Sequence, residues 1–445
     1  MAARLTGALH DLKRRVANNP DYGWSIASGY GHVLVNIVVQ ILLVPLYLQY
    51  LGKVQFGVLV ILLAGINYLG LGIAWMSSGA ARIMGEHAAH KRPQALERTY
   101  GLSKIIFLIY ATLSAGSAWA VVWTSQNDLF ANNPALAADA VRMVSLGVVY
   151  VIVLYDLNVD RLMLISTARQ AWANLLNVIA LVVFAATVIL VLTNGGGLVG
   201  VVGALLGGVV LARAVSFVLV RRLGLRLRWP GPQARTDLRR LLGPMGLGYA
   251  AYGALLLTLL QADMLILGLL GGPLLVADFV LVWKIADVAM QALWRLPESL
   301  TPYLIQMDSR GEHHRMRSIY ATAQKAMVGL AALVAVGFAL FGQSLVELWV
   351  GVEYAPDLPW AYALSGGALF WMVIARLPAI YAFSTVNLAP LVSVTALETT
   401  AKIVLVFALF QTLGLYAPLI AINVIHILGV AYLYQRLFRQ SIKPS

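Results

Sequence analysis

Roughly a dozen apolar stretches of about 20 residues divide this sequence of 445 residues, and the short polar joints between them carry nearly all of its charge. A stretch of this length crosses the hydrocarbon core of a bilayer as a single helix. Hydrophobic residues make up 60% of the chain and charged residues 11%, which leaves too little polar surface for a soluble protein of this size. The sequence therefore predicts a multi-pass membrane protein.

The apolar runs predict helices, because the strands of a membrane barrel alternate apolar and polar residues and these runs are continuous. Hydropathy predicts an all-α polytopic membrane protein with about twelve transmembrane helices. The predicted spans are residues 23–48, 55–81, 100–124, 142–165, 171–193, 198–220, 245–269, 274–300, 319–345, 358–384, 390–411 and 416–436.

The joints on one side of these spans hold most of the Lys and Arg residues outside the spans, including seven arginines between Arg221 and Arg240. The joints on the other side hold Lys53 and Arg142. Because short cytoplasmic loops carry an excess of Lys and Arg, we expect both termini in the cytoplasm. The same distribution explains the net charge of +13 without a nucleic-acid partner, and the polar, basic start does not resemble a cleavable signal peptide.

Short sequence echoes suggest two related halves. Three recur at offsets of 217 to 219 residues: Leu51-Gly52 with Leu270-Gly271, Ser166-Thr167 with Ser384-Thr385, and Gly197-Leu198 with Gly414-Leu415. A fourth, Gly85-Glu86-His87 with Gly311-Glu312-His313, has an offset of 226. They predict two six-helix lobes related by a pseudo-two-fold axis along the membrane normal. The expected parts are a cytoplasmic segment 1–22, an N-lobe 23–220, a basic cytoplasmic linker 221–244, a C-lobe 245–436 and a cytoplasmic tail 437–445.

A row of polar residues follows one face of the predicted eighth helix: Lys284, Asp287, Gln291, Arg295 and Glu298. A charge at the centre of a transmembrane helix costs roughly 2.5–3.5 kcal/mol, so this face must meet the bundle interior or water. Such residues often line a transport path. The alternative is that Lys284 with Asp287, and Arg295 with Glu298, only neutralise each other within the helix.

Other polar groups also lie inside predicted spans. The first span has a stripe, Ser25, Ser28, His32, Asn36 and Gln40, for which helix-packing hydrogen bonds are an equal alternative. Further candidates are Asp263, Arg376 and an i,i+4 pair, Glu398 with Lys402. Arg295 and Arg376 each begin Arg-Leu-Pro, where the proline frees a backbone carbonyl. We also expect Asp156, Asp160 and Arg161 to pair locally, and Arg213 to reach the cytoplasmic interface.

Several chemistries are excluded by motif. The chain has no Gly-x-x-x-x-Gly-Lys-Ser/Thr loop and no joint long enough for a nucleotide-binding domain, so ATP is not the direct energy source. It has no His-Glu-x-x-His motif, and we expect neither a metal site nor a cofactor. The duplication favours a transporter over an enzyme.

Two stretches resemble a known family. Pro45-Leu46-Tyr47, Tyr50-Leu51-Gly52 and Gln55-Phe56-Gly57-Val58 are similar to the opening of polysaccharide-transport flippases of the multidrug/oligosaccharidyl-lipid/polysaccharide exporter superfamily. Leu348-Trp349-Val350-Gly351 with Glu353-Tyr354-Ala355-Pro356 resembles a later stretch of that family. The resemblance implies a bacterial inner-membrane flippase for an undecaprenyl-diphosphate-linked oligosaccharide, such as an O-antigen unit of lipopolysaccharide. It also implies alternating access driven by a cation gradient.

On this hypothesis the substrate is bound by two arginines and two lysines, together with four polar residues. These are Arg295, Arg376, Lys284 and Lys402, with His32, Asn36, Gln40 and Gln291. Asp263, Asp287 and Glu398 are the expected carriers of the coupling ion, Na⁺ or H⁺. Expected partners are the lipid-linked oligosaccharide, membrane lipids and the glycan polymerase machinery.

Two alternatives stay open. A drug or metabolite antiporter of the same superfamily would share the architecture and take soluble organic cations. A polytopic glycan polymerase or ligase would need catalytic residues on a sizeable outer loop, and the longest outer joint, about residues 125–141, is short.

Overall fold

A computed structural model describes residues 20–129, 134–222, 224, 226–231, 234–241 and 243–441, and these are helical almost throughout, with no strand among them. The all-α prediction is confirmed. The helices are α2 (Pro20–Leu69), α3 (Leu71–Ala89), α4 (Pro93–Leu129), α5 (Pro134–Ser166), α6 (Gln170–Thr193), α7 (Gly197–Arg222), α8 (Ala234–Leu241), α9 (Pro244–Ser309), α10 (His313–Val350), α11 (Pro359–Ser384), α12 (Leu388–Leu413), α13 (Tyr416–Ile425), the π-helical turn η1 (His426–Val430) and α14 (Ala431–Ser441).

Ten helices of the described chain are long and apolar enough to cross a membrane. Two of them contain a break: α2 at Gly52 (φ 77°, ψ 165°) and α9 at Gly272 (φ 77°, ψ 178°). Unbroken, α2 with 50 residues would be about 75 Å long, against a hydrocarbon core of about 30 Å, so each of these helices makes two crossings. Counted in this way, the described helices agree with the predicted twelve spans.

The internal repeat is visible in the backbone. Residues with positive φ recur at offsets of 217 to 220: Gly52 with Gly272, Lys91 with Gly311, Ala168 with Val386, and Gly197 with Gly414. Each pair joins equivalent helices. Two of the sequence echoes need correction, because the counterpart of Gly52 is Gly272, one residue after the expected Gly271, and Gly85 lies inside α3 whereas Gly311 lies in a turn. The Gly-Glu-His echo is therefore not a structural correspondence.

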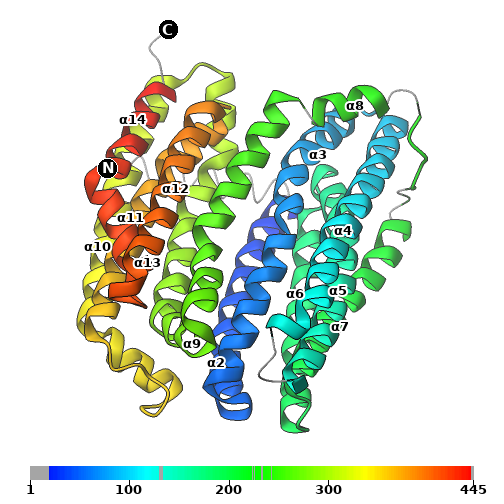
Figure 1. Cartoon of the computed structure of the whole chain (residues 1–445). Helices are drawn as coiled ribbons and strands as arrows, with labels where there is room; N and C mark the ends of the chain where they lie inside the picture. The colour runs from blue at the N-terminus through cyan, green and yellow to red at the C-terminus, as the bar shows by residue number, and fades with distance from the viewer. Residues whose placement is uncertain are drawn as a thin grey trace. The chain divides into compact units, whose positions relative to one another are not determined.

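The chain divides into two compact units, Met1–Leu46 with Gly72–Gly246, and Tyr47–Leu71 with Leu247–Ser445. In the first unit α5 packs between α4 and α7, and α6 packs on α7 (Figure 1). Its core is apolar, with Leu157, Leu164, Leu176 and Val209 almost completely buried. In the second unit α11 contacts α10, α13 and α14, and α12 packs against α13.

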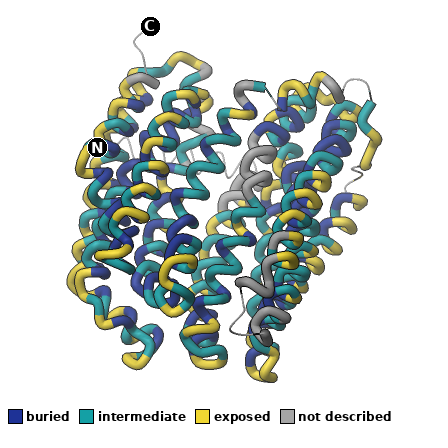
Figure 2. The backbone as a smooth tube through the Cα atoms, viewed as in Figure 1, coloured by how far each residue is buried: buried dark blue, intermediate teal, exposed yellow. Residues whose placement is uncertain are grey.

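The outer surfaces of the helices are apolar rather than polar. Figure 2 shows exposed positions distributed along most helices, and among them Leu113, Leu333 and Leu340 are 69–71% exposed. Large exposed aliphatic side chains on helix after helix are unfavourable in water and favourable against acyl chains. The described chain is that of a multi-pass membrane protein.

The predicted linker contains an ordered helix. Asp237 of α8 accepts a hydrogen bond of 2.6 Å from the Thr99 hydroxyl and lies 3.5 Å from His87, which holds α8 against α3 and α4. Arg240 donates to Glu86 at 2.6 Å, and this hydrogen bond lowers the pKa of the Glu86 carboxyl. The linker therefore belongs to the first unit.

Within the second unit the segment Tyr47–Leu71 approaches α9 very closely. A Cβ on Gly57 would lie 1.8 Å from the carbonyl oxygen of Pro273, so only glycine fits here. Nearby, the Lys53 ammonium lies 2.5 Å from the Asp278 carboxylate. The two helix breaks are thus joined by a backbone contact and an ion pair.

Gly57→Ala is expected to lower the free energy of unfolding by about 1–3 kcal/mol, because the added methyl group forces α2 away from Pro273. Gly65→Ala is the matched control, since nothing lies within 4 Å of a Cβ at Gly65 of the same helix. The control gains up to about 1 kcal/mol of helix propensity. Thermal unfolding in detergent measures both, and equal midpoints for the two variants would contradict the close contact.

Candidate functional site

A buried ion pair joins α9 to α12 in the second unit. Lys402 Nζ lies 2.7 Å from Asp263 Oδ2 and donates a second hydrogen bond of 2.7 Å to the Leu259 carbonyl oxygen. Lys402 is 5% exposed and Asp263 is 8% exposed. Although Lys402 lies one turn after Glu398, it does not contact that carboxylate and reaches across to α9 instead. Two of the three N–H donors of Lys402 therefore bind protein groups, as expected of a structural cation.

Glu398, one turn before Lys402, has a separate set of partners. Its Oε1 lies 2.9 Å from His426 Nε2, and its Oε2 accepts a hydrogen bond of 2.7 Å from the Tyr434 hydroxyl. Glu398 is 2% and His426 1% exposed, and the ring of Trp371 stacks on His426 at 5.9 Å. A carboxylate and an imidazole in direct contact form a group that can hold or release one proton.

His426 also marks an irregular turn. It begins η1, the π-helical turn that separates α13 from α14, and Gly429 within this turn has φ 143°. Single π-turns inside membrane-length helices frequently occur at functional sites, because they free backbone groups and reorient side chains. Here the turn presents His426 to Glu398.

The arginines of the two Arg-Leu-Pro motifs converge on a single carboxylate. Arg295 Nη1 lies 2.9 Å from Glu298 Oε2, and Arg376 Nη2 lies 2.6 Å from Glu298 Oε1. Arg376 also donates to the Tyr252 hydroxyl at 3.2 Å and stacks over the Trp294 ring at 4.5 Å. The Arg295 side chain is 46% exposed, which leaves part of its guanidinium open to a ligand.

The rest of the polar row on α9 pairs within the helix. Lys284 Nζ lies 3.6 Å from Asp287 Oδ2, and Gln291 donates to the same oxygen at 3.0 Å. Both pairs of this helix, Lys284 with Asp287 and Arg295 with Glu298, therefore neutralise each other, as the alternative reading of the row predicted. Glu298 has Arg376 as an additional partner.

Pro378 lies inside α11 and removes the hydrogen bond that the carbonyl of Ile374 would accept. Gln324 of α10 replaces it: its Nε2 donates to the Ile374 oxygen at 3.1 Å. A side chain on a neighbouring helix thus compensates for the proline, as is usual for prolines in membrane helices.

Gln324→Met is expected to lower the free energy of unfolding by about 1–3 kcal/mol, because the Ile374 carbonyl is left without a donor. With Pro378→Ala in the same chain the loss should be smaller, since an alanine at position 378 supplies the missing N–H. Chemical or thermal unfolding of the four proteins of this cycle measures the coupling. Additive effects of the two substitutions would show that Gln324 does not serve this carbonyl.

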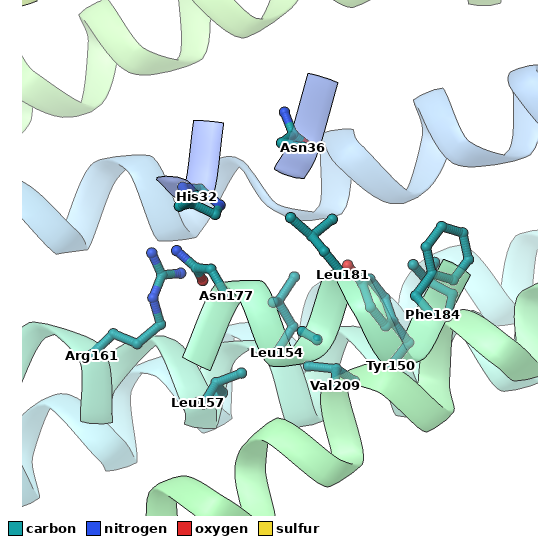
Figure 3. A pocket seen from close by; sticks show the side chains of 12 residues that line it. His32, Asn36, Tyr150, Leu154, Leu157, Arg161, Asn177, Leu181, Phe184 and Val209 are labelled. Atoms are coloured by element: carbon teal, nitrogen blue, oxygen red, sulfur yellow. The ribbon is translucent and has the colours of Figure 1, made fainter. Parts of the chain in front are cut away.

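The first unit contains a cavity of about 330 Å³ between α2, α5, α6 and α7. Figure 3 shows Arg161, Asn177 and His32 grouped at one end, and apolar side chains such as Leu154 and Leu181 along the rest. Asn36 also lines the cavity, whereas Gln40 does not. Of the predicted stripe on the first helix, His32 and Asn36 therefore share a cavity, and the side chain of Ser25 lies outside the described residues.

Ser28 has a packing role instead. Its hydroxyl accepts a hydrogen bond of 3.1 Å from Asn174 Nδ2 of α6. At this position of the stripe the polar side chain therefore serves helix packing.

Asp156 and Asp160 form an ion-pair cluster, but Arg161, which was expected to join them, does not. Lys104 lies 2.5 Å from Asp156 and 2.6 Å from Asp160, and Arg213 contacts both carboxylates. Arg161 points away from them into the cavity of Figure 3. Arg213 is thus an ion-pair partner rather than a side chain that only reaches the interface.

Several residues of these sites were not predicted from the sequence, among them Lys104, Gln324, His426 and Tyr434. A lone histidine in an otherwise apolar span, at position 426, was a usable signal, because an isolated ionisable group in a membrane helix needs a partner. For Gln324 the signal was weaker, since nothing in the sequence connects it to Pro378.

Neither a protein-family model nor a curated protein matches this sequence. Solved structures do match its fold. The chain is similar to a multidrug resistance MATE family transporter of the MOP superfamily in its inward-facing conformation, with a TM-score of 0.71 at 16% identity over 92% of this chain and 96% of that one. A structure of such a transporter in the outward-facing conformation matches with a TM-score of 0.68 at 17% identity over 94% and 95%.

The fold is that of a MATE transporter. A third match, with a TM-score of 0.63 and 17% identity over 95% of this chain and 94% of that one, is a MOP superfamily transporter from Pyrococcus furiosus, described as having a binding pocket of reversed polarity. The MATE fold has two lobes of six helices, in agreement with the twelve crossings and the positive-φ pairs described above. The more specific resemblance to polysaccharide flippases has no counterpart among these structures.

Proposed function

We propose that this protein is an ion-coupled exporter that works by alternating access. The observation that supports it most directly is the fold, which matches both inward-facing and outward-facing MATE transporters over more than 90% of each chain. The ionisable groups buried inside membrane-length helices are a second support, because such groups commonly mark substrate or ion pathways.

The proposed coupling ion is a proton at Glu398. Its carboxylate accepts a hydrogen bond from the Tyr434 hydroxyl and lies 2.9 Å from His426 Nε2, and both of these side chains are buried. Release of a proton from this group leaves a charge that His426 is placed to compensate. Asp263 is a weaker candidate for the coupling residue, because Lys402 already neutralises it. Asp287 is a weaker candidate for the same reason, because Lys284 neutralises it.

For the substrate we propose small amphipathic organic molecules, as in a multidrug-type exporter. The structural matches described as multidrug resistance transporters favour this alternative over the flippase. Reconstitution in liposomes with an imposed pH gradient tests it, with a panel of fluorescent cationic, neutral and anionic compounds. Gradient-dependent accumulation of at least one compound is expected, and its loss with a protonophore is the control. If the gradient moves no compound of the panel, this function is wrong.

A flippase for lipid-linked oligosaccharide is the second candidate. It is favoured by the family resemblance around Gln55-Phe56-Gly57-Val58 and by the two guanidinium groups at Glu298, which suit a diphosphate. Arg295→Ala and Arg376→Ala in cells that depend on this protein for surface glycan provide the test. Loss of surface glycan at normal protein level would support the flippase, and unchanged glycan would leave the drug exporter as the better proposal.

A bacterial inner-membrane location with both termini in the cytoplasm belongs to this proposal. The basic joints support it. A reporter that is active only in the cytoplasm, fused to Ser445, tests the orientation. An inactive reporter on a folded protein would show that the C-terminus lies on the opposite side of the membrane.

A further inference from the structure

The cavity between α2, α5, α6 and α7 has a cationic end, formed by Arg161, that none of the described residues lining it neutralises. Arg161 Nε is completely buried and has no hydrogen-bond partner. No ion pair to Arg161 is found among the described residues, and none of the described side chains that line the cavity is a carboxylate. Arg161 as a whole is only partly buried, and its side chain lines the cavity. A partly buried guanidinium without a counter-ion favours an anion in the space beside it.

The neighbouring acidic residues do not serve this role. Asp160, directly before Arg161 in the chain, is bound by Lys104, Arg213, Ser216 and the Tyr100 hydroxyl. These partners lie on α4 and α7, and Asp160 faces them rather than the cavity. The charge of Arg161 is therefore separated from the nearest carboxylates by the helix that carries it.

Two further donors lie beside the guanidinium. The Asn177 amide of α6 and the imidazole of His32 on α2 point toward Arg161 at the same end of the cavity (Figure 3). An arginine binds a carboxylate through two parallel N–H groups, and an amide and an imidazole N–H add donors to the same oxygens. Arg161 is five residues from the end of α5 at Ser166, which places this group in the half of the helix nearest the α5–α6 turn.

The remainder of the cavity is apolar. Leu154, Leu181 and Val209 line its middle, and the rings of Tyr150 and Phe184 close its far end (Figure 3). A volume of about 330 Å³ is at the small end of the range for ligand pockets. It suits a two-ring hydrocarbon body joined to one charged group.

We propose that this cavity is a binding site for an amphipathic organic anion, a carboxylate whose charged group meets Arg161, Asn177 and His32 and whose apolar body lies against Leu154 and Leu181. It specifies the substrate class of the proposed exporter and rests on that function for its physiological role. Binding itself does not depend on transport, so the two can fail separately.

Titration calorimetry on the full-length protein in an uncharged detergent tests the site with 2-naphthoate, 2-naphthamide and 2-naphthylmethylamine. These probes share one apolar body and differ in charge. We expect 2-naphthoate to bind at least tenfold more tightly than the amide or the amine. Equal affinities, or a preference for the amine, would overturn the proposal, and this comparison needs no variant.

Arg161→Gln is expected to weaken 2-naphthoate binding at least tenfold, and Arg161→Lys less, because the lysine keeps the charge without the planar fork. Arg142→Gln is the matched control on α5, since that side chain is 70% exposed, and it should bind as the wild type does. Asn177→Leu keeps the charge and removes one donor, so it serves if Arg161→Gln does not fold. Wild-type affinity in both Arg161→Gln and Asn177→Leu would refute the site.

The outcomes for site and function are distinguishable. If 2-naphthoate binds as expected and liposomes show no gradient-driven transport, the export function is wrong and the site stands. If liposomes export compounds of the panel and the wild type does not distinguish the three naphthalene probes, the site is wrong and the export function stands.

Discussion

Asp263→Leu should destabilise the protein by about 3–5 kcal/mol, because it leaves the Lys402 ammonium buried without its counter-ion. Lys402 is 5% exposed, and among the described residues its one further hydrogen-bond partner is the Leu259 carbonyl oxygen, so little solvent is available to replace the carboxylate. The loss is measured as a fall in the midpoint of thermal unfolding in detergent, together with the yield of folded protein.

The double variant Asp263→Leu with Lys402→Met is the control for this prediction. Removing both charges should restore most of the stability, because an apolar pair of similar size carries no desolvation cost. A double variant as unstable as the sum of the two single variants would show that the residues do not act as a pair. If the restored protein also exports its substrate, Asp263 and Lys402 are structural, and the roles in ion coupling and substrate binding predicted for them from sequence are wrong.

Glu398→Gln should reduce proton-driven export at least tenfold while the protein stays folded, a change of about 1.4 kcal/mol or more in the coupling step. Glutamine keeps the length of the side chain and an oxygen that accepts from Tyr434, but it does not exchange a proton. The measurement is uptake into liposomes under a pH gradient, with thermal unfolding to check the fold.

Thr395→Val is the matched control for Glu398→Gln. It removes the 3.2 Å contact between the Thr395 and Tyr434 hydroxyls and leaves the carboxylate intact, so export should stay near the wild-type rate. Wild-type export by Glu398→Gln would exclude this residue as the carrier of the coupling proton. A similar loss in both variants would point to disturbed packing around Tyr434 instead.

The polar row on α9 shows which contacts can be predicted from helical spacing and which cannot. Its residues were correctly placed on one helix face, because i, i+3 and i+7 positions coincide on any helix. Lys284–Asp287 and Arg295–Glu298 are three residues apart and were foreseeable as pairs for the same reason. The contact of Arg376 with Glu298 was not, since it joins residues 78 positions apart.

Positions 398 and 402 illustrate the opposite case. Their i,i+4 spacing would allow an ion pair within α12, but each side chain has its partner elsewhere: Lys402 on α9, 139 positions away, and Glu398 at His426. A local pair at i,i+4 contributes only a few tenths of a kcal/mol, whereas a buried charge needs complete hydrogen bonding, so the tertiary partner prevails.

Hydropathy was sufficient for the class of protein and the number of crossings, because a span of about 20 apolar residues has few alternatives in a bilayer. It was not sufficient for the sites. Whether Arg161 joins Asp160 or turns into a cavity with His32 and Asn177 depends on the rotation of α5 against α2, α6 and α7. That rotation follows from the packing of many side chains together, and no local pattern in the sequence contains it.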